Sequence, residues 1–508
     1  MQYFQYIGKR DPAWLAALAS VVISVWIIAT DDLINSDGVL YIEVASKMFN
    51  GEWLASIKQY SWPFYSLLIA LVSKISFLGL EISAHILNVL FQALLAFMFV
   101  RCAQVLGGNY KVTVFAVILL LTNLTMNGYR DQIIRDFGYW AFFFTALYFF
   151  LQYYQLRITK YAVGFGVSML VATLFRIEGI VFLFLAPLLI LWNERKYKEN
   201  TYNIILLLSP VLLIVVSGSV YVMLSDITFV SIGRLGEPLS YIQNAYHNVV
   251  VGIPEKGDIL EEKVLSLYAR NMGTLSMLAI LFMMFIVKIM SASGLIALFF
   301  SVKAYLANNI KTSIKSLNII NGFIIINAMI LIVFVLSANF LTPRYTMTMG
   351  LLITLPAAFG LSYFMESRFD SSKWKRRAKV MLVIVFVYMF LDGLTSFAAS
   401  KTYIKESGAW LRENAPKEAR LIANERMLYY YAGKELDQEG IVTGLKMGNG
   451  IVGLSEKKIG YDYIAIKLRK KKTHYEKRLI EWSGSKPIFR SSNERGDTVL
   501  IFKLNNVQ

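Results

Sequence analysis

Long apolar runs separated by short polar segments fill most of the first 400 residues. Runs of roughly 17–25 apolar residues match the thickness of the hydrocarbon core of a bilayer, which is typical of transmembrane helices. The first extends from Trp14 to Ala29, and the polar, basic segment Met1–Arg10 before it lacks a cleavable signal, so a retained helix is expected. Further spans are predicted at 82–106, 112–126, 137–156, 161–176, 179–193, 203–224, 318–338, 344–363 and 379–398.

The apolar stretch 272–306 has two interpretations. Two crossings would place Lys303, Lys311 and Lys315 outside and would leave the C-terminus inside. One crossing followed by a helix on the cytoplasmic surface agrees with the positive-inside rule. We therefore prefer about 11 spans to the alternative of about 13, and both counts place the chain from residue 400 onward outside.

Composition supports this polytopic, all-α membrane domain: hydrophobic residues make up 56%, charged residues 17%, and mean hydropathy is +0.52. The net charge of +17 would suggest nucleic acid as a partner. Most basic clusters instead flank apolar runs, so we predict no nucleic-acid binding. Lys9–Arg10 and Lys373–Arg377 are expected in the cytoplasm, and the lone Cys102 excludes a disulfide framework. A bacterial inner (plasma) membrane fits this pattern.

The tail changes character after residue 399. Charges become dense, and the short runs Tyr463–Ile466 and Val499–Phe502 are β-like. Ile404–Asn414 reads as an amphipathic helix that ends before Pro416. We predict a transmembrane domain over 1–399, with a first external loop at about 30–81, and a soluble α/β periplasmic domain over 400–508.

Carboxylates and arginines gather on the predicted outer face. Asp31 and Asp32 mark the exit of the first span, and Asp37 follows them. Ionisable groups at membrane depth are costly and usually face a cavity or a partner. Acids and arginines drawn from separate loops indicate a site that binds an anion and contains a base, which fits a phosphate-bearing lipid. The set is Asp31, Asp32, Asp37, Glu43, Lys58, Arg130, Asp131, Arg135, Asp136, Arg176, Glu178, Arg234, Arg344 and Tyr345.

The segment Asp37–Tyr41, followed by Ala45 and Gly51, resembles the first-loop signature of GT-C glycosyltransferases. In that signature an acidic residue precedes tyrosine by four positions. The closest likeness is to the aminoarabinose transferase and protein O-mannosyltransferase branch. Where the family has a Lys-Pro-Pro-like stretch, this chain has Trp62–Tyr65 without the lysine, and we expect Lys58 to stand in for it.

Four later segments resemble further elements of that family. They are its Arg-containing second external motif, its Arg-x-Glu-Gly corner, its late Arg-Tyr motif and the start of its C-terminal periplasmic domain. In this chain they are Arg135–Gly138, Arg176–Gly179, Leu341–Tyr345 and Trp410–Pro416.

The resemblance, together with chemistry, predicts an inverting glycosyltransferase that uses a polyprenyl-phosphate sugar. The acceptor is a lipid, glycan or protein at the outer face of the membrane, and membrane lipids are further partners. A phosphate leaving group needs cations rather than a general acid, and the acceptor needs a base, for which Asp37 is suited. The expected donor phosphate-binding residues are Arg135, Arg344, Arg130 and Lys58, and the supporting acids are Asp136, Glu178 and Asp32.

Alternatives stay open at this point. Asp37 could cap the amphipathic segment 38–50, and Arg176 with Glu178 is best interpreted as a structural ion pair. A divalent metal ion (Mg or Mn) with oxygen ligands could be bound by Asp37 and Asp136, together with Asp31 and Asp32. The three scattered histidines support no His-based site. A flippase or transporter of lipid-linked sugars, and a glycan polymerase or ligase, are the competing functions.

Overall fold

The computed structural model describes most of the chain. The described residues are 11–30, 33–192, 200–212, 234, 236–366, 373–395, 401–437, 439–442, 446–447, 451–452, 460–470 and 475–504. They divide between two compact units. The first contains Met1–Ile27, Asn88–Arg130 and Arg135–Thr395, and the second contains Ile28–Leu87, Asp131–Ile134 and Ser396–Gln508.

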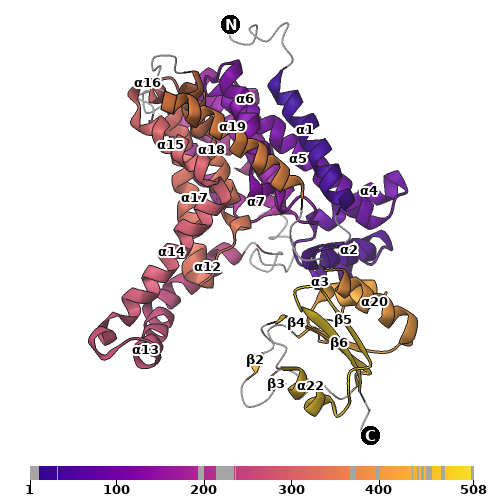
Figure 1. The fold of residues 1–508 in the computed structure, drawn as a ribbon. Coiled ribbons are helices and arrows are strands. Elements are labelled where there is room, and N and C mark those ends of the chain that lie inside the picture. The colour runs from indigo at the N-terminus through magenta and orange to yellow at the C-terminus, as the bar shows by residue number, and fades with distance from the viewer. Residues whose placement is uncertain are drawn as a thin grey trace. The chain divides into compact units, whose positions relative to one another are not determined.

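The first unit is a helical bundle (Figure 1). Its helices are α1 (Pro12–Thr30), α5 (Leu80–Val105), α6 (Tyr110–Leu121), α7 (Leu124–Asn127), α8 (Asp136–Leu156), α9 (Thr159–Phe175), α10 (Gly179–Leu185), α12 (Glu237–His247), α13 (Ile253–Lys263), α14 (Gly273–Ser293), α15 (Leu295–Leu306), α16 (Asn308–Lys311), α17 (Leu317–Ala338), α18 (Pro343–Glu366) and α19 (Lys373–Leu394). Residues 28–30 of α1 and 80–87 of α5 belong to the second unit. Shorter helical segments are the 3₁₀ turns Ala186–Trp192 and Leu267–Met272, the π-helical turn Asn248–Gly252 and the apolar helix Asn200–Leu212.

Within the described residues, five helices are long and apolar enough to cross a membrane: Pro12–Thr30, Leu80–Val105, Leu267–Ser293, Leu317–Ala338 and Pro343–Glu366. Shorter apolar helices accompany them, among them α6, α9 and α15. The chain is therefore a multi-pass membrane protein with a predominantly helical bundle, as the apolar pattern predicts.

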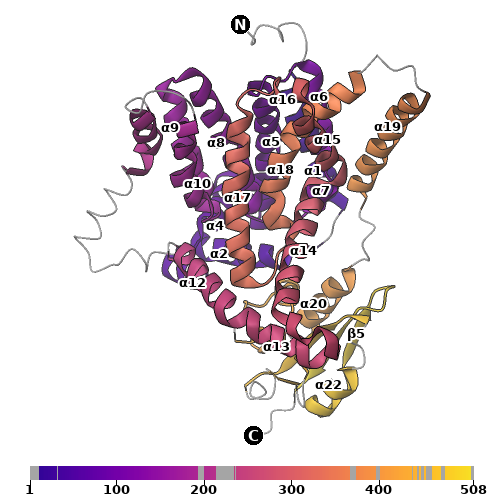
Figure 2. The same cartoon turned by 90° about the vertical axis from the view of Figure 1, so that its left-hand side faces the viewer.

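The segment 272–306 passes along the bundle once. Thr346 at the start of α18 donates a hydrogen bond to the Lys288 carbonyl of α14 (2.9 Å). Farther along α18, Gly350 lies against the backbone of Ala292, and Gly360 lies against that of Phe300 in α15. The contacts occur in the same order along both segments. Helices α14 and α15 therefore run one after the other, parallel to α18 (Figure 2). This agrees with one pass and not two, but α15 packs against α18 and is not the separate surface helix that was expected.

Gly294 separates the two helices with φ +77°, a conformation open to glycine. Two other segments differ from expectation. The span predicted at 112–126 stops at Leu121, because Asn123 caps α7 through the Met126 N–H (2.9 Å) and donates to the Ala292 carbonyl (2.8 Å). Part of the predicted long loop 225–270 is helical, as α12 and α13.

An aromatic cluster fills the bundle between α8, α10 and α17. The Phe143 ring lies 4.8 Å from that of Phe182 and 5.9 Å from that of Phe323, and Phe150 lies 5.5 Å from Phe323. The edge-to-face contacts among them are favourable arrangements for aromatic quadrupoles. This packing fixes the ends of α8 and α10, where charged side chains occur.

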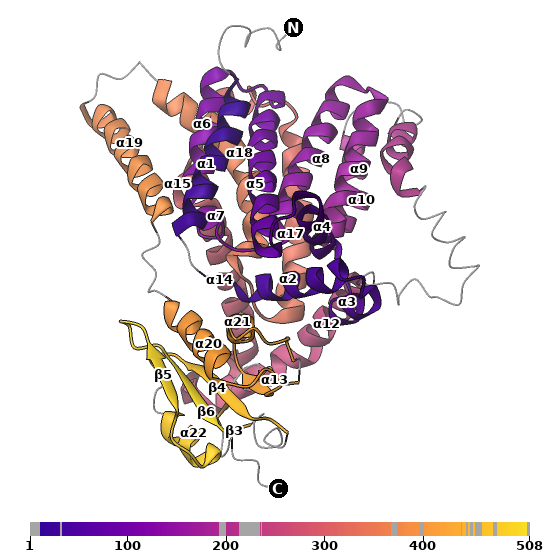
Figure 3. The same ribbon diagram turned by 90° about the vertical axis from the view of Figure 1, so that its right-hand side faces the viewer.

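The second unit has a helical part and a small sheet (Figure 3). Its helices are α2 (Ser36–Phe49), α3 (Trp53–Gln59), α4 (Phe64–Ser76), α20 (Thr402–Asn414), α21 (Arg426–Tyr431) and α22 (Tyr475–Ser483). Its strands are β1 (Leu421–Ala423), β2 (Lys446–Met447), β3 (Ile451–Val452), β4 (Tyr463–Leu468), β5 (Phe489–Ser492) and β6 (Thr498–Lys503). Helix α20 and the strands β4 and β6 lie where the sequence predicts them.

The larger sheet has the strand order β1-β4-β6-β5, and β2 pairs separately with β3. Strand β1 runs parallel to β4, whereas β6 is antiparallel to both β4 and β5. Ile464, Ile466 and Phe502 belong to a core against which the α22 side chains pack. On α20, Trp410 stacks on Phe489 of β5 at 5.1 Å. The C-terminal region is thus an α/β domain, as predicted.

Polar contacts tie the first external segment to the C-terminal region within this unit. Glu43 of α2 accepts a hydrogen bond from the Leu436 N–H (3.1 Å), and the Tyr430 hydroxyl donates to Glu81 (2.6 Å). The Ile34 N–H donates to the Tyr431 hydroxyl (3.0 Å). The predicted division assigned the loop at 30–81 to the membrane domain, so the compact units divide the chain differently.

Candidate functional site

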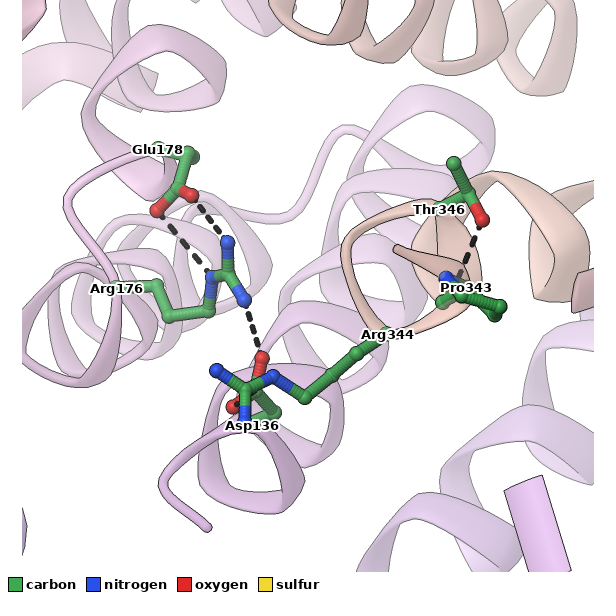
Figure 4. A network of polar contacts seen from close by, with 6 residues as sticks. All are labelled: Asp136, Arg176, Glu178, Pro343, Arg344 and Thr346. Carbon is green, nitrogen blue, oxygen red and sulfur yellow. Dashed lines mark hydrogen bonds and ion pairs between the residues drawn. The ribbon is translucent and has the colours of Figure 1, made fainter. Parts of the chain in front are cut away.

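Asp136 is the centre of a charged cluster made by three separate parts of the bundle (Figure 4). Its carboxylate, at the first residue of α8, forms an ion pair with Arg176 from the α9–α10 corner. Arg344 at the start of α18 approaches the other carboxylate oxygen, with its Nε 3.5 Å away. The Asp136 side chain is 1% exposed, so this pairing compensates a buried charge.

Local structure explains why these groups meet. The Phe175 ring, at the end of α9, packs where a side chain on Gly138 would stand. This close approach brings the next residue, Arg176, to the first turn of α8. The helix dipole favours the negative charge of Asp136 in the first turn of α8. It disfavours the positive charge of Arg344 in the first turn of α18, and the Asp136 carboxylate compensates that charge.

Arg176 is held on all sides. Glu178 pairs with it through both carboxylate oxygens, and its guanidinium lies 4.7 Å from the Tyr345 ring centre and 5.7 Å from that of Tyr139. Burial acts to raise the pKa of Glu178, but the Arg176 guanidinium outweighs burial and holds that pKa below its usual range. The structural ion pair expected for Arg176 and Glu178 is confirmed.

Arg135 is a third arginine whose charge acts on this cluster. Arg135 precedes Asp136 as the residue before α8, and its charge acts on both Asp136 and Glu178. Among the described residues, three guanidinium groups (Arg135, Arg176, Arg344) therefore act on this cluster together with the carboxylates of Asp136 and Glu178. Arg176 is buried, whereas Arg135 and Arg344 are partly exposed.

A cavity of about 210 Å³ opens beside the cluster. Arg176, Glu178 and Tyr345 line it together with many apolar side chains, including Leu331 and Phe334 of α17. A pocket with an apolar body and a few convergent charged groups is typical of a ligand site. Its polarity suits an amphipathic ligand with a charged group at one end.

Sequence reasoning missed two pocket residues. Asn327 is 4% exposed, and its Oδ1 has no hydrogen-bond partner among the residues that the structure describes. A polar side chain within an apolar span is the signal that could have found it. Tyr241 lies on α12, in the region expected to be a loop, and no periodic pattern marked it.

Arg130, predicted to bind the donor phosphate, is enclosed by the bundle. Its side chain is fully buried and donates to Asn127 (2.8 Å), Ser24 (2.6 Å) and Gln92 (2.7 Å). These neutral oxygens belong to α1, α5 and α7, so the guanidinium holds three helices together. This enclosure favours a structural role over the predicted contact with a lipid phosphate.

Asp37 lies in the other unit, at the second residue of α2, and is partly exposed. The Asn35 side chain does not cap this helix; it donates to the Ile133 carbonyl (3.2 Å) and accepts from the Ile133 N–H (2.7 Å). A side chain at position 38 would collide with Asn35 and Ile133, so glycine allows these two residues to approach each other. The start of α2 is thereby fixed to 131–134, while the first turn suits the negative charge of Asp37.

Tyr41, one turn beyond Asp37, is a packing residue. Its ring meets Tyr65 of α4 edge to face at 5.1 Å and Tyr60 at 5.7 Å. Lys58 is exposed in the last turn of α3, and its phosphate role stays a prediction. Asp32, and Asp31 beside it, lie outside the described residues.

The metal prediction is not supported at Asp136, because guanidinium groups contact both of its oxygens. No group of three or more His, Cys, Asp or Glu residues that could hold a metal ion occurs in the described part of the chain. Metal binding at Asp37 stays a prediction, and we derive no catalytic step through a metal ion.

Comparison with known proteins identifies the fold of this chain. No family model matches the sequence, and no curated protein matches it. Among solved structures, ArnT from Cupriavidus metallidurans bound to undecaprenyl phosphate is similar, with 12% identity, a TM-score of 0.51 and coverage of 96% of this chain and 97% of that one.

Two structures of an oligosaccharyltransferase from Archaeoglobus fulgidus are also similar. AglB in complex with an inhibitory peptide and a dolichol-phosphate has 12% identity, a TM-score of 0.52 and coverage of 92% of this chain and 71% of that one. The complex with Zn and sulfate has 13% identity, a TM-score of 0.54 and coverage of 97% and 73%. The chain has the GT-C fold. The fold that the motifs predict is therefore confirmed, and the residues Asp136, Arg176 and Arg344 lie at helix ends within it.

Proposed function

We propose that this chain is an inverting glycosyltransferase that moves a sugar from a polyprenyl-phosphate donor to a lipid, glycan or protein acceptor. The observation that carries the proposal is the largely apolar cavity lined by Arg176, beside the cluster in which Asp136 pairs with Arg176 and Arg344. A polyprenyl phosphate has the same division into an apolar chain and an anionic group. The structures of similar fold that contain undecaprenyl phosphate and dolichol-phosphate support this choice of ligand.

The chemistry requires few groups. An acceptor oxygen or nitrogen attacks the anomeric carbon, the bond from that carbon to the phosphate oxygen breaks, and its electron pair leaves with the phosphate. Arg344 and Arg135 stabilise the charge that develops on the phosphate, so no general acid is needed. The proton of the acceptor passes to the Asp37 carboxylate as base. One displacement inverts the anomeric centre.

Arg176, Glu178 and Asp136 take a different role in this proposal. Arg176 is engaged by two carboxylates, so its charge is already compensated. Asp136 orients Arg344 and Arg176 at once, which restricts both guanidinium groups before the donor binds. We assign these three residues to positioning and not to contact with the transferred sugar.

We place the protein in a bacterial inner (plasma) membrane, with Asp37, the charged cluster and the region 400–508 on the periplasmic side. The flanking basic residues Lys373–Arg377 and the odd number of crossings that the sequence predicts support this orientation. In this orientation the cluster meets a donor lipid whose sugar has already been moved to the periplasmic side.

The test is turnover by the purified protein in detergent or nanodiscs. Radiolabelled polyprenyl-phosphate sugars are supplied with lipid, glycan and peptide acceptors, and the anomeric configuration of the product is determined. Transfer with inversion is expected. A flippase would move the donor across a vesicle membrane without forming product, and a polymerase or ligase would require a diphosphate-linked oligosaccharide. Either result would refute the proposal.

A further inference from the structure

Helix α19 touches the rest of its unit at its two ends. Near its start, the Lys379 ammonium donates to the Met365 carbonyl of α18 (2.9 Å). Near its end, the Leu394 carbonyl accepts from Trp26 of α1 (3.2 Å), and Gly393 lies against the Asn127 side chain. No residue of α19, which is described from Lys373 to Leu394, is buried. These contacts anchor the helix near both ends, and the side chains between them stay at least partly exposed.

The space along this middle part is an apolar groove of about 400 Å³ between α19 and α6. From α19 it is lined by Leu382, Val383, Phe386, Val387 and Phe390, which recur on one helical face. From α6 it is lined by Phe115 and Ile118, among others. Such walls form favourable contacts only with another apolar group.

One end of the groove continues into a second hollow, of about 630 Å³, that is charged. Phe115 and Met365 line both spaces. The second hollow adds Lys111, Lys379 and Glu366, so its described lining contains two lysines and one carboxylate. Lys111 lies 3.5 Å from Glu366, and both side chains are well exposed.

The dimensions of the groove match one leaflet of a membrane. Lys379 and Phe390 are separated by about 16 Å along the axis of α19, at roughly 1.5 Å per residue. That is about half of a hydrocarbon core of about 30 Å. The charged hollow lies at the end of α18, whereas Arg344 and the candidate active site lie at its start, about 33 Å away along the helix.

We propose that this groove is a binding site for an anionic membrane phospholipid. The phosphate group lies at Lys111 and Lys379, and one acyl chain lies between α19 and α6, where it completes the packing of a helix that the protein itself leaves open. The excess of lysine over glutamate selects a headgroup with net negative charge. The site is separate from the proposed donor pocket and does not depend on glycosyl transfer.

Native mass spectrometry of the full-length protein tests this site without an activity assay. The protein is extracted from membranes that contain equal amounts of phosphatidylglycerol and phosphatidylcholine, and the retained lipid is measured. The wild type is expected to retain one phosphatidylglycerol in preference to phosphatidylcholine. Lys111→Gln should reduce retention by roughly five-fold, and Glu366→Gln should increase it. Lys373→Gln removes an equal charge from the exposed start of α19 and should leave retention unchanged.

A further variant tests the apolar groove between α19 and α6. Val383→Trp should fill the groove and abolish retention while the thermal unfolding temperature of the detergent-free protein in nanodiscs changes little. Equal retention of both lipids by the wild type, equal effects of Lys111→Gln and Lys373→Gln, or full retention by Val383→Trp would each overturn the proposal.

Discussion

Arg344 Nε lies 3.5 Å from Asp136 Oδ2, which joins the starts of two helices that are far apart in the sequence. Asp136 also pairs with Arg176, so one buried carboxylate holds two guanidinium groups. Arg344 remains partly exposed, with a side-chain exposure of 21%, whereas Arg176 is at 7%. The two arginines should therefore respond differently to substitution.

Arg344→Ala should lower the turnover number for transfer by about 10²–10³-fold, because the charge that stabilises the leaving phosphate is lost. Arg344→Lys keeps the charge but loses the paired geometry, so an intermediate loss is expected. Arg135→Ala should act in the same direction. Steady-state kinetics with varied donor measures these effects. Arg490→Ala, on the C-terminal sheet, is the control and should leave the turnover number unchanged. Full activity in both Arg344→Ala and Arg135→Ala would refute the assignment of these arginines to phosphate binding.

Asp37→Asn should lower transfer by roughly 10²–10⁴-fold, the range that a general base contributes. The substitution is nearly isosteric, so the unfolding temperature should stay within the error of the measurement. Glu52→Gln removes a carboxylate from the exposed turn that follows α2 and serves as the matched control. Wild-type turnover by Asp37→Asn would refute the assignment of the base.

Arg130→Met should reduce stability and leave the specific activity of the folded fraction intact. The side chains of Ser24, Gln92 and Asn127 lose a buried donor, and each unsatisfied group costs about 1–3 kcal/mol. Thermal unfolding and turnover per folded molecule are measured on the same preparation. A stable but inactive variant would show that Arg130 contributes to donor binding after all.

Glu43→Gln should make the stability of the second unit less dependent on pH. Burial raises the pKa of Glu43 above its ordinary value, in spite of the hydrogen bond from Leu436. The folded state therefore binds the proton more tightly than the unfolded state does. The stabilisation is complete below the unfolded pKa of about 4.5 and is lost as pH rises through the folded pKa. At neutral pH the glutamine variant should unfold at a higher temperature than the wild type, and at pH 4 the two should converge. A lower unfolding temperature at neutral pH would contradict this account.

Residues 400–508 should be external. The single native cysteine, Cys102, is buried, so Cys102→Ser provides a background for labelling. Lys417→Cys should react with a membrane-impermeant maleimide on cells with a permeabilised outer membrane, because the position is exposed. Lys375→Cys, in the basic run before the last span, should be protected until the inner membrane is lysed. The reverse pattern would invert the proposed orientation.

The sequence by itself determined the helices and the class of protein, because apolar runs of sufficient length must be helical in a bilayer. It also located α20, which ends before Pro416, and the short strands β4 and β6. These features depend on local pattern. Motif order predicted the GT-C fold, since Arg135–Gly138, Arg176–Gly179 and Leu341–Tyr345 all fall at helix ends.

Only the tertiary structure decided which charges meet. Asp136 pairs with Arg176 and Arg344, and the close packing of Phe175 at Gly138 is what allows the first contact. The burial of Arg130 among α1, α5 and α7 depends on how helices pack, and so does the single pass of α14 and α15 along α18. Hydrophobic periodicity specifies which face of a helix is buried, but not which distant helix covers it. Long-range ion pairs and enclosed arginines are therefore fixed by packing.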